Sequence, residues 1–242
     1  EEVNVPSKAF QMDTSWEQAQ GFVQRLGKTA DQLGLGFGVK FSNTLIVENH
    51  RSFFPESEKE MYLSGPPLHV LATNLVDRFR TRFGDDYPIS FSAGIDRKNF
   101  ADAVAIGLTP ITSCSDLLKA GGYSRATTYF RELDSRMDRL GVNSIPEYII
   151  KAYGNGEEAL SECGKNEKDS RLIACRRALE NGTSLMEAAG PDLFEKWLSS
   201  AKLLNTRTYV EQATEDERYA KVKNNKAPTK VGSMLELFDC LT

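Results

Sequence analysis

Two turns near the middle of the chain carry residue types that suit the binding of an anion. Ala93-Gly94-Ile95 follows a β-type run at 89–92, and Ser113-Cys114-Ser115 lies at the end of a second run at 111–114. Small side chains leave room for a ligand, while backbone N–H groups and the start of a helix favour a negative charge. The pattern therefore predicts a phosphate cradle, with one alternative left open: glycine in such a turn also serves close packing alone.

A third polar segment follows the first clear strand, which we expect near residues 38–42. Ser42, Asn43 and Thr44 stand at its carboxyl end, where barrel enzymes place their active sites. Amide and hydroxyl groups offer donors and acceptors to the edge of a heterocycle, but the same residues could form a turn closed by the Asn side chain. Lys40, inside the strand, could point outward or toward a ligand.

The elements that must position these segments form a strand–helix–strand unit. Asp96 can cap a helix whose apolar positions include Phe100 and Leu108, and this helix separates the runs at 89–92 and 111–114. Two strands joined by one helix of this length are parallel neighbours with a right-handed crossover. Their carboxyl ends, and with them the two turns, therefore lie at the same edge of the sheet.

Apolar residues at helical spacing predict the flanking helices. A capping box at Ser15 predicts the start of the first helix. We expect its apolar stripe to pack on a sheet. The stripe consists of Trp16, Ala19, Val23, Leu26, Ala30 and Leu33. Two further helices are marked by Leu71, Leu75, Phe79 and Phe83, and by Ala126, Phe130, Leu133, Met137 and Leu140. Residues 45–60 predict a loop or small hairpin, residues 144–220 a series of helices, and residues 221–230 a polar linker.

Length and composition are those of an ordinary globular protein. The chain has 242 residues, 40% of them hydrophobic and 26% charged, with a net charge of −4. This charge gives no reason to expect nucleic acid or an anionic membrane as a partner, and no apolar run approaches the roughly 20 residues that span a bilayer. Four scattered cysteines without a secretory signal predict free thiols in a reducing cytoplasm. Neither His50 nor His69 has partners at metal-binding spacing.

Two sequence strings carry a resemblance to flavin-binding barrels. SAGI, which contains the first turn, and SCSDLL, which contains the second, resemble the last two strands of the (β/α)8 barrel in dihydropyrimidine and dihydroorotate dehydrogenases. The longer string SCSDLLKAGGYSRATTYF is similar to a narrower family, the selenate reductase large subunits, which are iron–sulfur flavoproteins related to the glutamate synthase small subunit. The resemblance implies an α/β fold in which the FMN phosphate lies on the two turns. It implies a flavin ring near Asn43, Thr44, Ser64 and Gly65.

The resemblance also implies a domain order. Residues 1–142 would form the C-terminal part of a TIM barrel, residues 143–230 a helical extension, and residues 231–242 the truncated start of a ferredoxin-type iron–sulfur segment. The parallel strands near 38–42, 89–92 and 111–114 would be strands six to eight. Cys240 would be an iron–sulfur ligand only in a longer chain, because one thiolate holds no cluster.

The same resemblance predicts what this segment would work with. EEVNVPSKAF has neither an initial Met nor a signal-peptide pattern, so we expect an excised or incomplete segment. Its partners would be the upstream barrel half, which carries the catalytic base, the downstream redox domains and a small-molecule substrate; no catalytic residue is identified. Three parallel strands leave a sheet edge open, which missing residues or a homo-oligomer would cover.

The sequence is compatible with three functions. The favoured one is a segment of an FMN-dependent oxidoreductase that is inactive alone. The second is a degenerate, non-catalytic barrel that serves as a scaffold for redox domains or a partner subunit, and Ala93 in place of the usual glycine favours it. The third is an aldolase- or synthase-type barrel for a phosphorylated substrate, although no lysine stands at a strand end and Lys40 lies within its strand.

Overall fold

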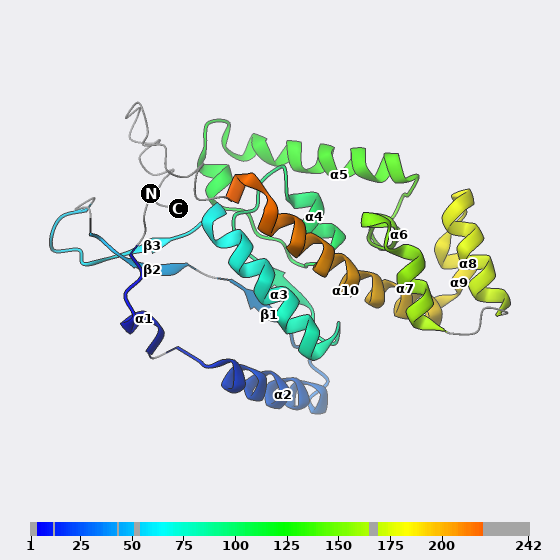
Figure 1. The fold of residues 1–242 in the computed structure, drawn as a ribbon, viewed down its shortest axis with the longest axis horizontal. Helices are drawn as coiled ribbons and strands as arrows, with labels where there is room; N and C mark the ends of the chain where they lie inside the picture. The colour runs from blue at the N-terminus through cyan, green and yellow to red at the C-terminus, as the bar shows by residue number, and fades with distance from the viewer. Residues whose placement is uncertain (1–3, 12, 43, 51–53, 165–168, 220–242) are drawn as a thin grey trace.

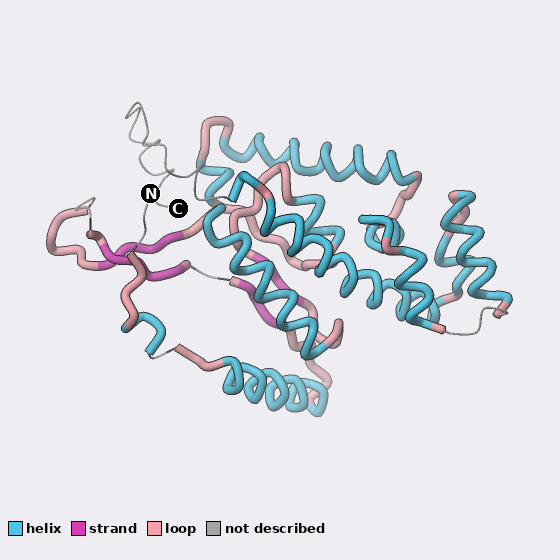
Figure 2. The backbone as a smooth tube through the Cα atoms, in the orientation of Figure 1, coloured by secondary structure: helices cyan, strands magenta, loops and turns pink. Residues whose placement is uncertain are grey.

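The computed structural model describes residues 4–11, 13–42, 44–50, 54–164 and 169–219. A small pair of parallel strands lies beneath α3 (His69–Phe83), and α10 (Pro191–Glu215) runs beside α3 (Figure 1). Figure 2 shows that helices make up most of the described chain and that its strands are short. Among the described helices, none combines the length and the hydropathy that crossing a bilayer requires.

The parallel strands are β1 (Val39–Phe41) and β4 (Ile89–Phe91). They pair in register, residue 39 with 89 through 41 with 91, and Ile111 adds a single parallel bridge to Phe91. The predicted parallel order of the three segments is confirmed, but the third is a bridge rather than a full strand. The described strands do not close into a barrel.

Side chains alternate between the two faces of this sheet, as strand geometry requires. The apolar residues of β1 and β4 lie in one cluster with Val76 and Phe79 of α3. Lys40 and Ser90 are register partners on the other face, and Lys40 is exposed. Lys40 therefore points away from the core that α3 covers.

The hairpin, one of the two forms predicted for residues 45–60, is present, whereas the helix after β4 is shorter than predicted. The segment after β1 forms a hairpin of β2 (Leu45–Glu48) and β3 (Glu60–Leu63), which pair antiparallel. The helix after β4 is α4 (Phe100–Ala105), and it ends before the predicted core position Leu108. Gly107 explains the early end, because its φ of +69° suits glycine and ends the helical path.

Helix α2 (Trp16–Gln32) begins at the predicted capping box but turns a different face to the core. Two residues in the second half of the predicted stripe are exposed, Leu26 by 54% and Leu33 by 67%. Gly27 faces the core instead, where a Cβ would lie 2.6 Å from the hydroxyl of Tyr87. The close approach at this glycine turns Leu26 and Leu33 outward, so the predicted packing of the stripe is confirmed for Trp16 and Val23 and wrong for these two leucines.

The buried faces of α3 and of α5 (Ala126–Leu140) are also partly shifted. Leu71 is 62% exposed and Phe130 is 56% exposed, against the prediction for both residues. In α3 the buried set includes His69 and Arg80, because α10 packs on a second side of this helix. Leu133 of α5 is buried as predicted.

The predicted series of helices after residue 144 is confirmed within the described residues. Its members are α6 (Ile145–Lys151), α7 (Gly156–Cys163), α8 (Ser170–Asn181), α9 (Leu185–Ala189) and α10, while the short α1 (Lys8–Gln11) lies near the other end of the chain. A core around the fully buried Trp197 joins α7 to α10, and its indole N–H donates to the carbonyl of Gly156 at 2.7 Å. Helix α10 continues to the parallel sheet, where Tyr209 and Ala213 share a cluster with Phe91.

Candidate functional site

The carboxyl ends of the parallel segments surround a cavity of about 310 Å³. Its walls come from segments far apart in the sequence, and the lining residues are Ser42, Thr44, Ser64, Gly65, Leu68, Ser92, Ala93, Gly94, Ile95, Thr112, Cys114 and Ser115. The structure thus brings together every described residue that the sequence assigned to the site, except Ser113. Asn43 lies outside the described residues.

The side chain of Ser113 turns away from the cavity and supports the neighbouring turn. Its hydroxyl donates to the carbonyl of Ile95 at 3.0 Å and lies 3.1 Å from the hydroxyl of Tyr129. Ser113 shares the core-facing side with Ile111, because residues two apart in an extended segment point the same way. Contrary to the sequence prediction, Ser113 therefore does not line the cavity but supports the turn 93–95.

Gly94 brings two walls of the cavity into close contact. Its φ is +58°, and a Cβ there would lie 2.7 Å from Cα of Pro66 and 2.8 Å from the carbonyl carbon of Gly65. A larger side chain would meet this backbone before it reached the cavity. The packing role that the sequence left open therefore holds at this position.

The cavity offers hydroxyl groups and backbone N–H groups, and none of its described lining residues is charged. Ser64 Oγ is buried and has no hydrogen-bond partner among the described residues. Within the same part of the chain, the backbone N–H groups of Gly94 and Ile95 have no acceptor either. A buried polar group normally has a partner, so Ser64 Oγ, together with the two N–H groups beside it in the lining, marks a place for a polar ligand.

A charged cluster that the sequence reasoning missed supports the turn after residue 113. Asp116 is buried, and its carboxylate accepts hydrogen bonds from Arg125 (2.7 and 3.1 Å) and from the hydroxyl of Tyr129 (2.6 Å). Burial by itself would raise the pKa of Asp116, but the bonds from Arg125 and Tyr129 outweigh it and lower that pKa. Burial, and next the bond to Asp116, raise the pKa of Tyr129 to about 12.

The lowered pKa of Asp116 predicts a loss of stability in acid. Its carboxylate form stabilises the fold above the pKa of an unfolded aspartate, and this contribution disappears as the pH falls through the lower folded value. We expect the free energy of unfolding of Asp116→Asn to depend less on pH between about 5 and 2 than that of the wild type. Urea unfolding across this range measures the slope. Asp134→Asn, at an exposed position of α5, is the control and should keep the wild-type slope.

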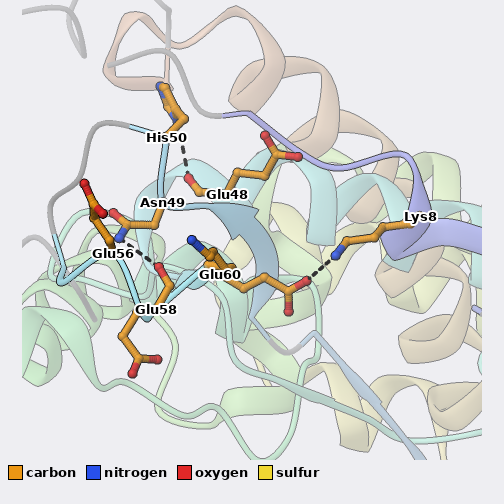
Figure 3. A pocket seen from close by; sticks show the side chains of 8 residues that line it. Lys8, Glu48, Asn49, His50, Glu56, Glu58 and Glu60 are labelled. Atoms are coloured by element: carbon orange, nitrogen blue, oxygen red, sulfur yellow. Dashed lines mark hydrogen bonds and ion pairs between the residues drawn. The ribbon is translucent and has the colours of Figure 1, made fainter.

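A second cavity, of about 370 Å³, lies beside the β2–β3 hairpin (Figure 3). Lys8 Nζ lies 2.9 Å from a carboxylate oxygen of Glu60, and Asn49 Nδ2 donates to the carbonyl of Glu58 at 2.9 Å. The carboxylates of Glu56 and Glu58 point away from each other in Figure 3. In the part of the chain that the structure describes, no group of three or more His, Cys, Asp or Glu could hold a metal ion.

The remaining candidate residues have separate places. Cys114, Cys163 and Cys175 are free thiols, as predicted for them. Cys240, the iron–sulfur ligand expected in a longer chain, lies outside the described residues. Lys40 is not among the residues that line the cavity, so the geometry gives no support to a Schiff-base function there.

Comparisons with known proteins assign most of the chain to a barrel-type domain. Residues 1–159 match the family described as "Oxidoreductase YgfK, N-terminal TIM-barrel domain". The chain is 36% identical over 170 residues to "Putative oxidoreductase YgfK" of Escherichia coli strain K12, and equally so to that of Escherichia coli O157:H7. Each match covers 65% of this chain but only 16% of the relative, so the chain spans a small part of these relatives' length. No solved structure matches the chain. The chain belongs to the family of the YgfK oxidoreductase N-terminal TIM-barrel domain.

Proposed function

We propose that this chain supplies an FMN-binding wall of a flavin-dependent oxidoreductase. The observation that carries the proposal is the convergence of unpartnered donors on one cavity: Ser64 Oγ and the N–H groups of Gly94 and Ile95. Donors without an acceptor in the protein suit an anionic, oxygen-rich ligand. Membership of an oxidoreductase family favours a cofactor with phosphate and heterocycle over a phosphorylated substrate alone.

The two ends of the cofactor would meet different walls. The turns 93–95 and 113–115 would bind the phosphate through backbone N–H groups and hydroxyls, and Thr44 and Ser64 would face the ring. A volume of about 310 Å³ is at the low end for ligand pockets. It therefore suits the phosphate and the ribityl chain of FMN, and further barrel residues would enclose the flavin ring. Bound FMN would supply the hydride or electron transfer, and the protein would orient the cofactor.

The proposal extends to the longer protein implied by the relatives' length. In that protein we infer a selenate reductase-type iron–sulfur flavoprotein, related to the glutamate synthase small subunit, that acts on a small molecule in the cytoplasm. An iron–sulfur segment beginning near Cys240 would receive or deliver electrons. Free thiols at Cys114, Cys163 and Cys175 are compatible with the reducing compartment that this assignment requires.

The phosphate assignment can be tested by comparing FMN with riboflavin, which lacks the phosphate. We expect the purified protein to bind FMN at least tenfold more tightly, and Cys114→Asp to remove most of this preference. The cysteine is exposed at the cavity, so a carboxylate there would repel the phosphate without disturbing the core. Fluorescence quenching of each flavin measures the two dissociation constants.

Two controls sharpen this test. Cys114→Ser keeps the size and neutrality of the side chain and should keep the preference for FMN. Thr127→Asp places the same charge on an exposed position of α5 and should change neither affinity. Equal affinities for FMN and riboflavin in the wild-type protein would contradict the phosphate assignment.

A non-catalytic scaffold is the second candidate, and the absence of charged side chains among the described lining residues favours it. Flavin phosphate sites commonly gain strength from a positive charge, which these walls do not supply. The two candidates differ in what the protein retains after purification. FMN released from the purified protein would support the FMN-binding function. If neither FMN nor riboflavin binds at any concentration, the result would support the scaffold.

A further inference from the structure

The C-terminal end of α10 and the following turn, Glu217–Tyr219, lie behind the turn 93–96 of the candidate site. Figure 1 shows this end of α10 beside the start of α3. Residues 209–219 lie beyond the family match, which ends at residue 159. These residues are nevertheless connected to the site, because they bond to two fully buried side chains, His69 and Asn99, that contact the turn.

The first connection runs from Tyr209 through His69 to Ala93. His69 Nδ1 lies 2.7 Å from the carbonyl oxygen of Ala93, and Nε2 lies 2.6 Å from the hydroxyl of Tyr209. A carbonyl oxygen can only accept, so Nδ1 carries the proton and donates it. Burial lowers the pKa of His69, which the bond to Ala93 only partly opposes, so the ring stays neutral. Nε2 is therefore an acceptor, and Tyr209 donates to it.

The second connection runs from Tyr219 through Asn99 to Gly94. Asn99 Nδ2 donates to the carbonyl of Gly94 at 2.8 Å and to the hydroxyl of Tyr219 at 3.1 Å. Asn99 Oδ1 accepts from the backbone N–H of Asp96 at 2.8 Å. The ring of Tyr219 also stacks on His69, with 5.2 Å between centroids and 16° between planes. The two connections therefore meet at Tyr219.

These bonds decide which way the peptide groups of the turn point. In a trans peptide, the C=O of one residue and the N–H of the next lie on opposite sides. His69 and Asn99 hold the carbonyls of Ala93 and Gly94 toward the core. The N–H groups of Gly94 and Ile95 must then point the other way, and neither of them has an acceptor among the described residues.

We propose that Tyr209 and Tyr219 are positioning residues for the anion-binding turn, acting through His69 and Asn99. The inference rests on the proposed function, because the ligand of these N–H groups is the phosphate assigned above. It makes the anion-binding unit discontinuous: the donors come from residues 93–95, and the groups that orient them come from residues 209–219. Tyr209 and Tyr219 do not touch the ligand themselves.

The test removes one hydroxyl at a time and keeps each ring. Tyr209→Phe and Tyr219→Phe should each weaken FMN binding about three- to tenfold and leave riboflavin binding unchanged. Tyr148→Phe is the control, because Tyr148 is as buried as Tyr209 and donates to the carbonyl of Ala101 at 3.1 Å, away from the turn. It should lower stability to a similar degree and leave the ratio of the two affinities unchanged.

A second readout separates this inference from the proposed function. The amide ¹⁵N and ¹H chemical shifts of Gly94 and Ile95, recorded without flavin, should move in Tyr209→Phe and stay in place in Tyr148→Phe. Unmoved shifts in Tyr209→Phe would overturn the positioning role whatever the protein binds. Moved shifts in a protein that does not prefer FMN to riboflavin would keep the positioning of the turn and overturn only the assignment of the ligand.

Discussion

Replacing Gly94 with valine should lower the free energy of unfolding by about 3 kcal/mol or more. A β-branched side chain is strained at a φ of +58°, and its Cβ would lie within 2.8 Å of the backbone at Gly65 and Pro66. This contact joins rigid backbone on both sides, so relief requires the two walls of the cavity to separate. Chemical denaturation followed by circular dichroism measures the loss, and FMN binding should fall with it as the walls move.

Gly36→Val is the matched control for this substitution. Gly36 is exposed, its φ is not positive, and no atom lies within 4 Å of a Cβ built on it. The same change of residue should therefore cost less than about 1 kcal/mol there. Equal losses in the two variants would show that the close approach of residues 65–66 and 94 does not exist in solution.

Substituting Arg80 by methionine should cost about 2 to 4 kcal/mol. The guanidinium group is buried between α3 and α10, donates to the carbonyl of Ile106 and to the hydroxyl of Thr206, and lies 3.7 Å from a carboxylate oxygen of Asp85. Methionine fills much of the volume but leaves the Ile106 carbonyl without this donor. Burial lowers the pKa of Arg80 to about 10, so the group still carries its charge at neutral pH.

Arg78→Met, two residues away on the exposed side of α3, is the control for Arg80. Its guanidinium lies over the ring of Trp16, 4.4 Å from the ring centroid, and a cation–π contact at a surface stabilises by about 0.5–1 kcal/mol. Urea titration of both variants gives the comparison. A loss at Arg80 no larger than that at Arg78 would contradict the role of Arg80 in joining α10 to the strand–helix unit.

The candidate site could be predicted from the sequence because strand geometry is regular. Parallel strands place their carboxyl ends at one edge, so the turns after residues 92 and 112 had to approach each other once the strands were recognised. The same rule misplaced Ser113, because a one-residue difference in where a strand ends reverses the direction of a side chain. Ser64 was assigned to the site only by the resemblance to flavin-binding barrels. No local sequence pattern could have shown that its hydroxyl lacks a hydrogen-bond partner among the described residues.

The rest of the fold depends on contacts between distant residues. The apolar stripe of α2 had the right period, but Gly27 allows a close approach to Tyr87 that turns Leu26 outward. His69 had no features of a core residue, since a single histidine near a helix start gives no periodic signal. Its burial requires Tyr209, 140 residues later in the sequence, and no spacing rule connects two such positions.

Helix α10 lies beyond the residues that the family model matches, but it packs into the core of the matched region. The family match ends at residue 159, yet Tyr209 and Ala213 belong to the cluster that contains Phe91. A protein cut at the end of the match would expose that cluster to water and lose the bonds that orient the turn 93–96. Expression boundaries for this region should therefore be set after Tyr219, because the packed unit extends beyond the residues that the family model matches.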